Sequence, residues 1–348
     1  MTRMPFAKAA LLSLLLTACS GQRETPAAPA VTTASVTAKG ETTAVATANA
    51  DAADDPAIWR NAADPAASLI VGTDKKAGLY VYGMDGKVRD FFNAGRVNNV
   101  DLIDHAGRII VAASDRNNEA RAKIALFSLD PATAKLTPLG SVPAGAGEAY
   151  GICLAETDGA LTAFMVLKDG TINQVALDLS GATPAGKTVR TLKLATQSEG
   201  CVVDPRTNRL YVAEEDAGVW RFDARASGPT TPVKIAATDG KRLTADAEGV
   251  AIAPEGPGNG GYLVVSSQGD NAYAVYRLSD DSYVGRFRIS KGAFGSTEET
   301  DGIAIAPGSF GADYPDGLFI AQDGANAPAA QNFKLVSWAD IKAALGLQ

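Results

Sequence analysis

One pattern of residues recurs six times along this chain, and this repeat limits the possible folds more than any other feature. In each copy an acidic residue precedes a short apolar run, and a turn rich in Gly and Asp leads into a second apolar run. The acidic residues are Asp55, Asp101, Glu148, Glu199, Glu248 and Asp301, at spacings of 46, 47, 51, 49 and 53 residues. Repeats of about 50 residues are typical of β-propellers, in which each repeat forms one blade. We therefore predict an all-β fold, a six-bladed β-propeller, over residues 48–348.

The second apolar run of each copy has the composition of a β-strand. These runs are short, rich in β-branched and aromatic residues, and bounded by Gly or Asp. They cover residues 69–74, 109–115, 161–169, 210–215, 262–267 and 318–323. A length of 348 residues suggests two domains at about 150 residues each, but the repeat assigns nearly the whole chain to one.

The first residues have the composition of a targeting segment. Arg3 and Lys8 precede or flank the apolar run 9–16, which is too short for a transmembrane helix of about 20 residues. We interpret residues 1–18 as a signal peptide. The sequence Leu-Thr-Ala-Cys at 16–19 resembles the lipobox of bacterial lipoproteins, in which the cysteine is lipidated. This resemblance implies lipidation of Cys19, and Ser20 after it favours sorting to the outer membrane; ordinary cleavage near Ala18 is the alternative.

Residues 19–47 are expected to form the lipidated cysteine and a flexible tether. They are rich in Ala, Thr, Pro and Ser, contain no aromatic residue, and show no apolar periodicity. Such a segment buries too little apolar surface to offset the entropy of ordering it.

Cys153 and Cys201 lie inside short apolar runs, and two interpretations of them stay open. Buried free thiols are favoured, because both positions have the composition of strand interiors. A disulfide is possible in an oxidising compartment if the two strands are neighbours.

The repeat also predicts a metal site. A propeller gathers corresponding positions of its blades around one axis, so the six acidic residues should lie close together and repel one another. Divalent cations compensate such repulsion, and oxygen ligands without His or Cys favour Ca²⁺ over zinc. The alternative is that these acidic residues begin strands because Asp favours turns.

Basic residues recur just after the second strand of several copies, at Lys75, Lys76, Arg116 and Lys168. Metal ions next to fixed positive charges suit a phosphoryl group, which needs a Lewis acid, an activated water and cations on its oxygens. The formal net charge of −7 argues against binding nucleic acid through neutralised phosphates. The single histidine, His105, excludes a His-rich zinc site.

Several stretches, in order across about 290 residues, resemble the β-propeller phytases of bacteria. They are Ala-Asp-Asp-Pro-Ala-Ile-Trp at 53–59, Thr-Asp-Lys-Lys-Ala-Gly-Leu at 73–79, Asn-Asn-Val-Asp at 98–101, Ala-Glu-Glu-Asp at 213–216, Ser-Ser-Gln-Gly at 266–269, Ala-Gln-Asp-Gly at 321–324 and Gln-Asn-Phe-Lys at 331–334. The resemblance implies a six-bladed propeller and calcium-dependent release of phosphate from myo-inositol hexakisphosphate (phytate) by attack of a metal-activated water. We expect a monomer that binds phytate, touches the membrane only through its lipid anchor, and faces the periplasm or the exterior.

The resemblance also implies roles for individual residues. The implied calcium ligands are Asp54, Asp55, Asp101, Glu199, Glu214, Asp246, Glu248 and Asp301. Those that orient the attacking water are Asp55, Glu199, Glu248 and Asp301. The implied phosphate-binding set is Lys75, Lys76, Arg116, Tyr150, Lys168 and Gln268. Three positions depart from the family pattern: Glu41 is displaced, Glu298 and Glu299 represent one expected acid, and Gly295 stands where some relatives have Asp. A lactonase-like calcium propeller and a non-catalytic binding propeller are the alternatives; the first would not need the cluster of basic residues, and the second favours exposed aromatic residues.

Overall fold

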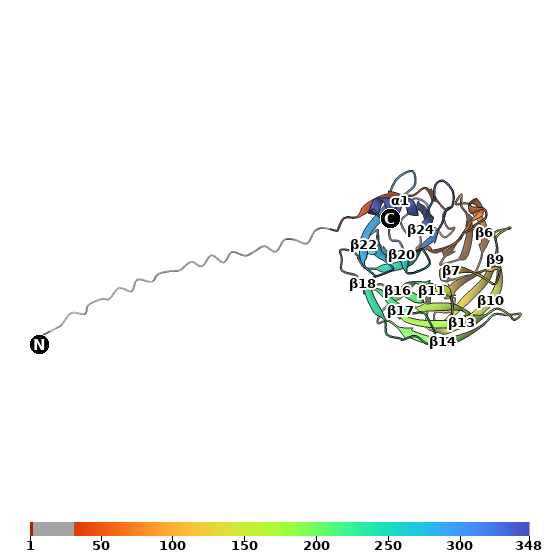
Figure 1. The fold of residues 1–348 in the computed structure, drawn as a ribbon, viewed down its shortest axis with the longest axis horizontal. Coiled ribbons are helices and arrows are strands. Elements are labelled where there is room, and N and C mark those ends of the chain that lie inside the picture. The colour runs from red at the N-terminus through yellow and green to blue at the C-terminus, as the bar shows by residue number, and fades with distance from the viewer. Residues whose placement is uncertain (3–30, 348) are drawn as a thin grey trace. The chain divides into compact units, whose positions relative to one another are not determined.

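The computed structural model describes residues 1–2 and 31–347, and nearly all regular structure in them is β-strand. Residues 3–18 of the predicted signal peptide, and Cys19, lie outside the described residues. The chain from Val31 onward forms one compact unit. Its strands form six sheets arranged as the blades of a propeller around a central axis (Figure 1). The predicted all-β, six-bladed fold is confirmed.

Each blade contains four antiparallel strands, and in blades 1 to 4 the strand that comes first in the chain lies innermost. Blade 1 contains β3 (Ala53–Trp59), β4 (Leu69–Asp74), β5 (Gly78–Gly83) and β6 (Val88–Phe92). Blade 2 contains β7 (Val97–His105), β8 (Arg108–Asp115), β9 (Arg121–Asp130) and β10 (Lys135–Ala146). Blade 3 contains β11 (Ala149–Thr157), β12 (Ala160–Leu167), β13 (Thr171–Asp178) and β14 (Ala185–Lys193).

The other three blades repeat this arrangement. Blade 4 contains β15 (Ser198–Asp204), β16 (Arg209–Glu214), β17 (Gly218–Asp223) and β18 (Val233–Ala237). Blade 5 contains β19 (Ala247–Glu255), β20 (Gly260–Ser267), β21 (Ala272–Arg277) and β22 (Tyr283–Ser290). Blade 6 takes three strands from the C-terminal part, β23 (Ile303–Pro307), β24 (Gly317–Asp323) and β25 (Asn332–Ser337). A helix, α1 (Trp338–Leu345), follows β25.

The fourth strand of blade 6 comes from near the N-terminus. Strand β2 (Gly40–Glu41) pairs antiparallel with β25, and β1 (Ala34–Thr37) adds a parallel fifth strand to blade 5 along β22. The Lys334 amine, fully buried, joins the ends of the ring, 2.6 Å from the Glu41 carboxylate and 3.1 Å from that of Asp323. Ordering these strands therefore closes the propeller.

The predicted tether is wrong for residues 34–37 and 40–41, which form these two strands. Both strands are short and pair only along the edge of an existing sheet. Val36 and Ala38 are the residues of this stretch that enter the apolar core. Such short strands carry too little periodic apolar signal to be recognised from sequence.

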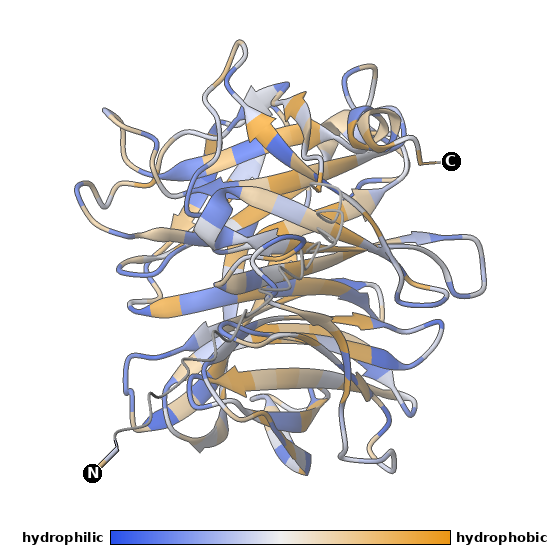
Figure 2. Ribbon diagram, turned by 90° about the vertical axis from the view of Figure 1, so that its left-hand side faces the viewer, coloured by the Kyte–Doolittle hydropathy of each residue, from blue (hydrophilic) through white to orange (hydrophobic). Residues whose placement is uncertain are grey.

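Six hydrophobic clusters hold neighbouring blades together, one for each interface. The cluster between blades 3 and 4 includes Phe164, Leu192, Val212 and Phe222, all nearly or fully buried. Hydrophobic residues gather along the strands, whereas the connecting loops are largely hydrophilic (Figure 2). None of the helices in the described part of the chain has the length and apolar character needed to span a membrane.

A disulfide joins Cys153 in β11 to Cys201 in β15, with their Cα atoms 5.7 Å apart. The favoured interpretation as free thiols is therefore wrong. The two cysteines are 48 residues apart, about one repeat, so they occupy neighbouring inner strands. The sequence showed the apolar surroundings but not the distance between the strands.

Candidate active site

The inner strand of each blade carries an irregularity where it meets the second strand. In blades 1 to 5 the register shifts just after the first residue of the inner strand. The residue after this first position corresponds from blade to blade. These residues are Asp54, Asn98, Tyr150, Glu199, Glu248 and, just before β23, Asp301. Their side chains meet at one end of the central axis, which we call the mouth.

The predicted ring of six carboxylates is wrong in the first three blades. The residues that correspond to Glu199 are Asp54, Asn98 and Tyr150, rather than Asp55, Asp101 and Glu148. The mouth therefore has four carboxylates, one amide and one phenol at this position. Asp55 and Asp101 stand one and three residues after the corresponding positions, and Glu148 stands two residues before, so counting from the apolar runs could not assign these blades correctly.

A second ring of residues follows the end of the second strand in each blade. Its members are Lys75, Arg116, Lys168, Glu215, Gln268 and Gly324. In every blade the backbone N–H of this residue donates to a carbonyl just before the inner strand. Blades 1 to 3 thus present cations at the mouth, whereas blade 4 presents a carboxylate. The mouth is basic on one side and acidic on the other.

The acidic side contains a buried cluster of Glu199, Glu215 and Glu248, with carboxylate oxygens within 4.8 Å of one another. Burial raises the pKa of Glu248 well above its ordinary value, and the neighbouring carboxylates, Glu199 first, raise it further. Burial and then Asp54 do the same for the pKa of Glu199. These groups are therefore costly to ionise unless a cation lies among them.

The donor atoms of this cluster suit a hard cation. All are oxygens, which Ca²⁺ prefers. Among the described residues, Asp54 Oδ1, Glu248 Oε2 and Asn98 Oδ1 are buried side-chain oxygens with no hydrogen-bond partner. Buried polar atoms normally have partners, so these oxygens are suited to ligate a metal. The amide of Asn98 also donates to Glu199 Oε1 at 2.7 Å, which orients that carboxylate.

Lys75 links the carboxylates of blades 1 and 6. Its amine lies 2.8 Å from Asp301, 3.0 Å from Asp54 and 2.8 Å from the exposed Asp51. Burial acts to lower the pKa of Lys75, but the carboxylates, Asp54 first, raise it above its ordinary value. Gln268 Nε2 donates to the other oxygen of Asp301 at 2.7 Å. Both Asp301 oxygens are thus held in place.

The basic side of the mouth surrounds Tyr150. Lys168 Nζ lies 5.1 Å from the centre of the Tyr150 ring, and the Arg116 guanidinium lies 6.0 Å from it. Arg116 Nη1 is also 3.3 Å from Glu148. Burial and then Glu199 raise the pKa of Tyr150, so its phenol stays protonated. Lys76 is exposed and forms no ion pair within residues 31–347.

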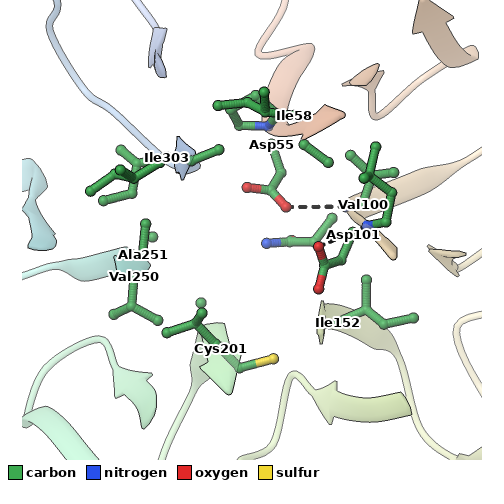
Figure 3. A pocket seen from close by; sticks show the side chains of 18 of the residues that line it. Asp55, Ile58, Val100, Asp101, Ile152, Cys201, Val250, Ala251 and Ile303 are labelled. Atoms are coloured by element: carbon green, nitrogen blue, oxygen red, sulfur yellow. Dashed lines mark hydrogen bonds between the residues drawn. The ribbon is translucent and has the colours of Figure 1, made fainter. Parts of the chain in front are cut away.

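Asp55 and Asp101 lie apart from the acidic cluster, in a cavity of about 210 Å³ along the central axis. Figure 3 shows both carboxylates projecting into this cavity among the side chains of Val100, Ile152 and Ile303. Asp55 Oδ2 accepts from the Val100 N–H at 3.1 Å, and Asp101 Oδ2 accepts from the Leu154 N–H at 2.8 Å. Each carboxylate therefore joins its own inner strand to that of the next blade.

Glu214 does not belong to the acidic cluster, although the sequence predicted it as a ligand. Glu214 Oε1 accepts from the backbone N–H of Ala195 and from both the N–H and the hydroxyl of Thr196; Oε2 accepts from Trp220 Nε1. Glu215, to which the sequence assigns no role, lies in the cluster instead. Its position matches that of Lys75, and this correspondence could have identified it.

Two further residues, Asp246 and Gln197, lie near the acidic cluster. Asp246, a predicted ligand, is half-buried just before β19, and it contributes to raising the pKa of Glu215 after burial. Gln197, which the sequence did not single out, donates to Glu215 Oε1 at 2.8 Å and to the Tyr150 hydroxyl at 3.3 Å. It links the acidic side of the mouth to Tyr150.

Substitution of Glu214 should affect stability, whereas substitution of Glu215 should affect metal binding. Glu214→Gln places an amide among four donors, so we expect a loss of about 1–3 kcal/mol in the free energy of unfolding. Glu215→Gln should not reduce the stability of the metal-free protein, because burial makes the charge of this side chain unfavourable, and it should weaken metal binding about 10-fold or more. Urea unfolding and calorimetric titration with Ca²⁺ measure the two effects. Equal losses of metal binding in both variants would contradict the assignment of Glu215.

The metal-free protein should lose stability as the pH rises. Burial raises the pKa of Asp301 to about 7 and that of Asp101 to about 6, from an ordinary value of 3.8. Between the ordinary and the raised values, the folded chain holds more protons than the unfolded chain, so the free energy of unfolding falls as pH increases. Thermal unfolding with a chelator should show this fall between about pH 4 and 7. Asp101→Asn should reduce the slope, and an unchanged slope would argue against the buried carboxylate as its source.

A propeller mouth with buried carboxylates on one side and Lys and Arg side chains on the other suits an enzyme that acts on phosphate esters. The chain belongs to the phytase family, whose family model matches residues 3–348. The chain is 39% identical over 330 residues to a 3-phytase of Bacillus subtilis (strain 168), covering 89% of this chain and 85% of the relative. The predicted resemblance is thus confirmed, and the chain is a phosphomonoester hydrolase.

Among solved structures, a chain in the crystal structure of the mitotic checkpoint complex is similar to this one. The TM-score is 0.50 at 14% sequence identity, over 95% of this chain and 86% of that chain. At this level of identity the likeness concerns the fold alone.

Proposed function

We propose that this phytase hydrolyses phytate with calcium bound at the mouth. The observation that carries the proposal is the juxtaposition of the buried Glu199, Glu215 and Glu248 cluster with Arg116 and Lys168 in one opening. Carboxylates alone would repel a polyanion, and basic residues alone would not require buried acids. Together they accommodate a cation and a phosphate side by side.

The acidic cluster would hold the calcium. Glu199, Glu215 and Glu248 supply the buried oxygens, and Asp54 supplies a further oxygen without a partner. Bound calcium would neutralise these carboxylates and make a neighbouring water easier to deprotonate. Asn98 and Gln197 orient Glu199 and Glu215 by hydrogen bonds.

The basic side would bind the phosphate. Arg116 and Lys168 contact the face of Tyr150, so their charged groups are held at one edge of the mouth. Their positive charge balances the equatorial oxygens of a phosphate in the transition state. Lys76, exposed on the same blade as Lys75, would bind an outer phosphate of a substrate that carries several.

Asp301 is suited to receive a proton from the attacking water. Its pKa, raised by burial to about 7, lies where an acid–base group works best at neutral pH. Lys75 and Gln268 fix its two oxygens, so its orientation is set before substrate binds. Attack by water in line with the leaving oxygen forms no bond between phosphate and protein.

Release of inorganic phosphate from phytate, with calcium and with a chelator, tests the proposal directly. We expect release with calcium and almost complete loss with the chelator, restored when excess calcium is added. Bound calcium should also raise the melting temperature, since a ligand of the native state stabilises it. Phosphate release that chelation does not affect would refute the role of calcium, and trapping of a phosphorylated residue would refute water as the nucleophile.

We propose that the protein is exported and acts outside the cytoplasm. The disulfide between Cys153 and Cys201 supports an oxidising compartment, in which such bonds persist. The apolar run 9–16 followed by Cys19 supports a lipid-anchored form at the outer membrane. A substrate too highly charged to cross a membrane would then be hydrolysed outside the cytoplasm.

A further inference from the structure

The disulfide lies directly beneath the mouth. Cys153 follows Tyr150 by three residues along β11, and Cys201 follows Glu199 by two residues along β15. At about 3.3 Å per residue, the bond is about 7–10 Å from these two residues along the strands. Figure 3 shows Cys201 at the edge of the central cavity, with its sulfur directed toward the side on which Ile152 lies. The bond thus links the strands that carry Tyr150 and Glu199.

The disulfide takes the place that a carboxylate has in the preceding blade. Asp101 stands three residues after Asn98, as Cys153 stands three residues after Tyr150, and these two pairs correspond in the register of their blades. Asp101 joins blade 2 to blade 3 through the Leu154 N–H. Cys153 joins blade 3 to blade 4 through Cys201. Corresponding positions thus connect adjacent inner strands, once by a hydrogen bond and once covalently.

The backbones of β11 and β15 approach closely between the disulfide and the mouth. A Cβ atom added to Gly151 would lie 1.9 Å from the carbonyl oxygen of Glu199, so no side chain fits there. Just above, Gln197 bridges the Tyr150 hydroxyl and Glu215. A small change in the spacing of the two strands would therefore alter how Tyr150 and Glu199 face each other.

We propose that the Cys153–Cys201 disulfide is a positioning element of the mouth, and that calcium binds there at full affinity only when the bond is formed. The inference rests on the proposed function, because it takes calcium as the ligand of the acidic cluster. The bond holds β11 of blade 3 against β15 of blade 4, which sets Tyr150 relative to Glu199, Gln197 and Glu215. Without the bond, the carboxylates of the cluster would still be present, but the position of Tyr150 relative to Glu199 would be less well fixed.

Calcium titration of the full chain without substrate tests this proposal. We compare the wild type with the Cys153→Ser/Cys201→Ser double variant by calorimetry, at a temperature at which circular dichroism shows both to be folded. Displaced supports of metal ligands commonly reduce affinity 10- to 100-fold, and we expect about 10-fold weaker calcium binding. Phosphate release should show a matching increase in the calcium concentration needed for half-maximal activity.

Leu192→Ala is the matched control. Leu192 is buried in β14 and belongs to the same hydrophobic cluster as Cys153. Strand β14 is the outermost strand of blade 3, so two strands separate it from the inner strand β11, which carries Tyr150. This variant should lower the melting temperature and leave calcium affinity unchanged. A loss of affinity as large as that of the double variant would show that general destabilisation, rather than positioning, is responsible.

If the double variant does not fold, reduction of the folded wild-type protein tests the role of the disulfide instead. A dithiol reductant transfers two electrons and two protons to the bond, giving the thiols of Cys153 and Cys201 and a cyclic disulfide of the reductant. The reduced protein, identified by two more free thiols than the oxidised protein, should bind calcium more weakly. Equal affinity in the oxidised and reduced proteins would overturn the positioning role. A wild type that binds calcium in this disulfide-dependent way but releases no phosphate from phytate would refute the proposed function alone.

Discussion

Replacing Glu248 with glutamine is expected to reduce phosphate release about 100-fold or more while the propeller stays folded. Glu248 is buried, its carboxylate belongs to the acidic cluster, and its Oε2 atom has no hydrogen-bond partner among the described residues. Glutamine has nearly the same shape but lacks the charge that holds a cation. The change should therefore weaken calcium binding without creating a cavity. Phosphate release at saturating and limiting calcium measures it.

The same substitution should stabilise the metal-free protein. Burial raises the pKa of Glu248, and Glu199, Asp301 and Glu215 raise it further, so the charged form is unfavourable without a cation. Removing this charge removes repulsion that the fold otherwise has to accommodate. We expect a higher melting temperature than the wild type in chelator and a lower one in excess calcium. A variant with a higher melting temperature in chelator and a lower one in calcium has lost a metal ligand, whereas loss of a residue needed only for folding would lower the melting temperature in both conditions.

Glu255→Gln provides the control for Glu248→Gln. Glu255 lies at the opposite end of the same strand, β19, and its side chain is partly exposed, 4.0 Å from Lys342. The substitution is chemically the same but far from the mouth along the strand. Its activity and calcium response should match the wild type. Near-normal turnover in Glu248→Gln would remove Glu248 from the proposed site.

Replacing Lys75 with methionine is expected to impair both stability and activity. The amine forms ion pairs with Asp54 and Asp301, whose side chains are 1% and 15% exposed, so its loss leaves buried carboxylates without their cation. Removing one partner of a buried pair commonly costs about 3–5 kcal/mol, and partial protonation of Asp301 would bring the loss toward the lower limit. Asp301 would also lose the contact that orients it, so turnover should fall steeply. Urea unfolding and phosphate release measure the two losses.

Lys76→Met is the control that distinguishes the role of Lys76 from that of Lys75. Lys76 is adjacent in sequence but exposed, and it pairs with no carboxylate in the described part of the chain. Its substitution should raise the KM for phytate and leave the free energy of unfolding unchanged. If Lys75→Met unfolded at the same urea concentration as the wild type, the ion pairs of Lys75 would have no role in stability.

The fold could be predicted from sequence because the repeat is a local signal that recurs. Each blade needs short apolar strands and polar turns at regular distances, and the stretches at 69–74 and 210–215 show this without reference to any partner. Strands β1 and β2 could not be predicted in this way. They gain order only from the edges of β22 and β25, which lie about 250 to 300 residues away in the chain.

The mouth was predicted in outline and assigned incorrectly in detail. Lys75, Arg116 and Lys168 occupy one corresponding position of their blades, as their spacing indicated. The acidic residues of the first three blades did not, because Asp55, Asp101 and Glu148 lie one, three and two residues away from the positions that face the mouth. Glu214 and Glu215 illustrate the consequence. Neighbouring residues at a strand end point to different sides, so one binds backbone and the other enters the cluster.

The fold class, the number of blades and the enzyme family could be predicted from the sequence, because these depend on periodic patterns and on motifs that lie along the chain. The three-dimensional structure was needed to establish which carboxylates share the acidic cluster, that Asp55 and Asp101 lie in the central cavity, and that Cys153 bonds to Cys201. Those features depend on the distance between strands of different blades. That distance follows from side-chain packing at six blade interfaces and from one-residue bulges, neither of which leaves a periodic trace in the sequence.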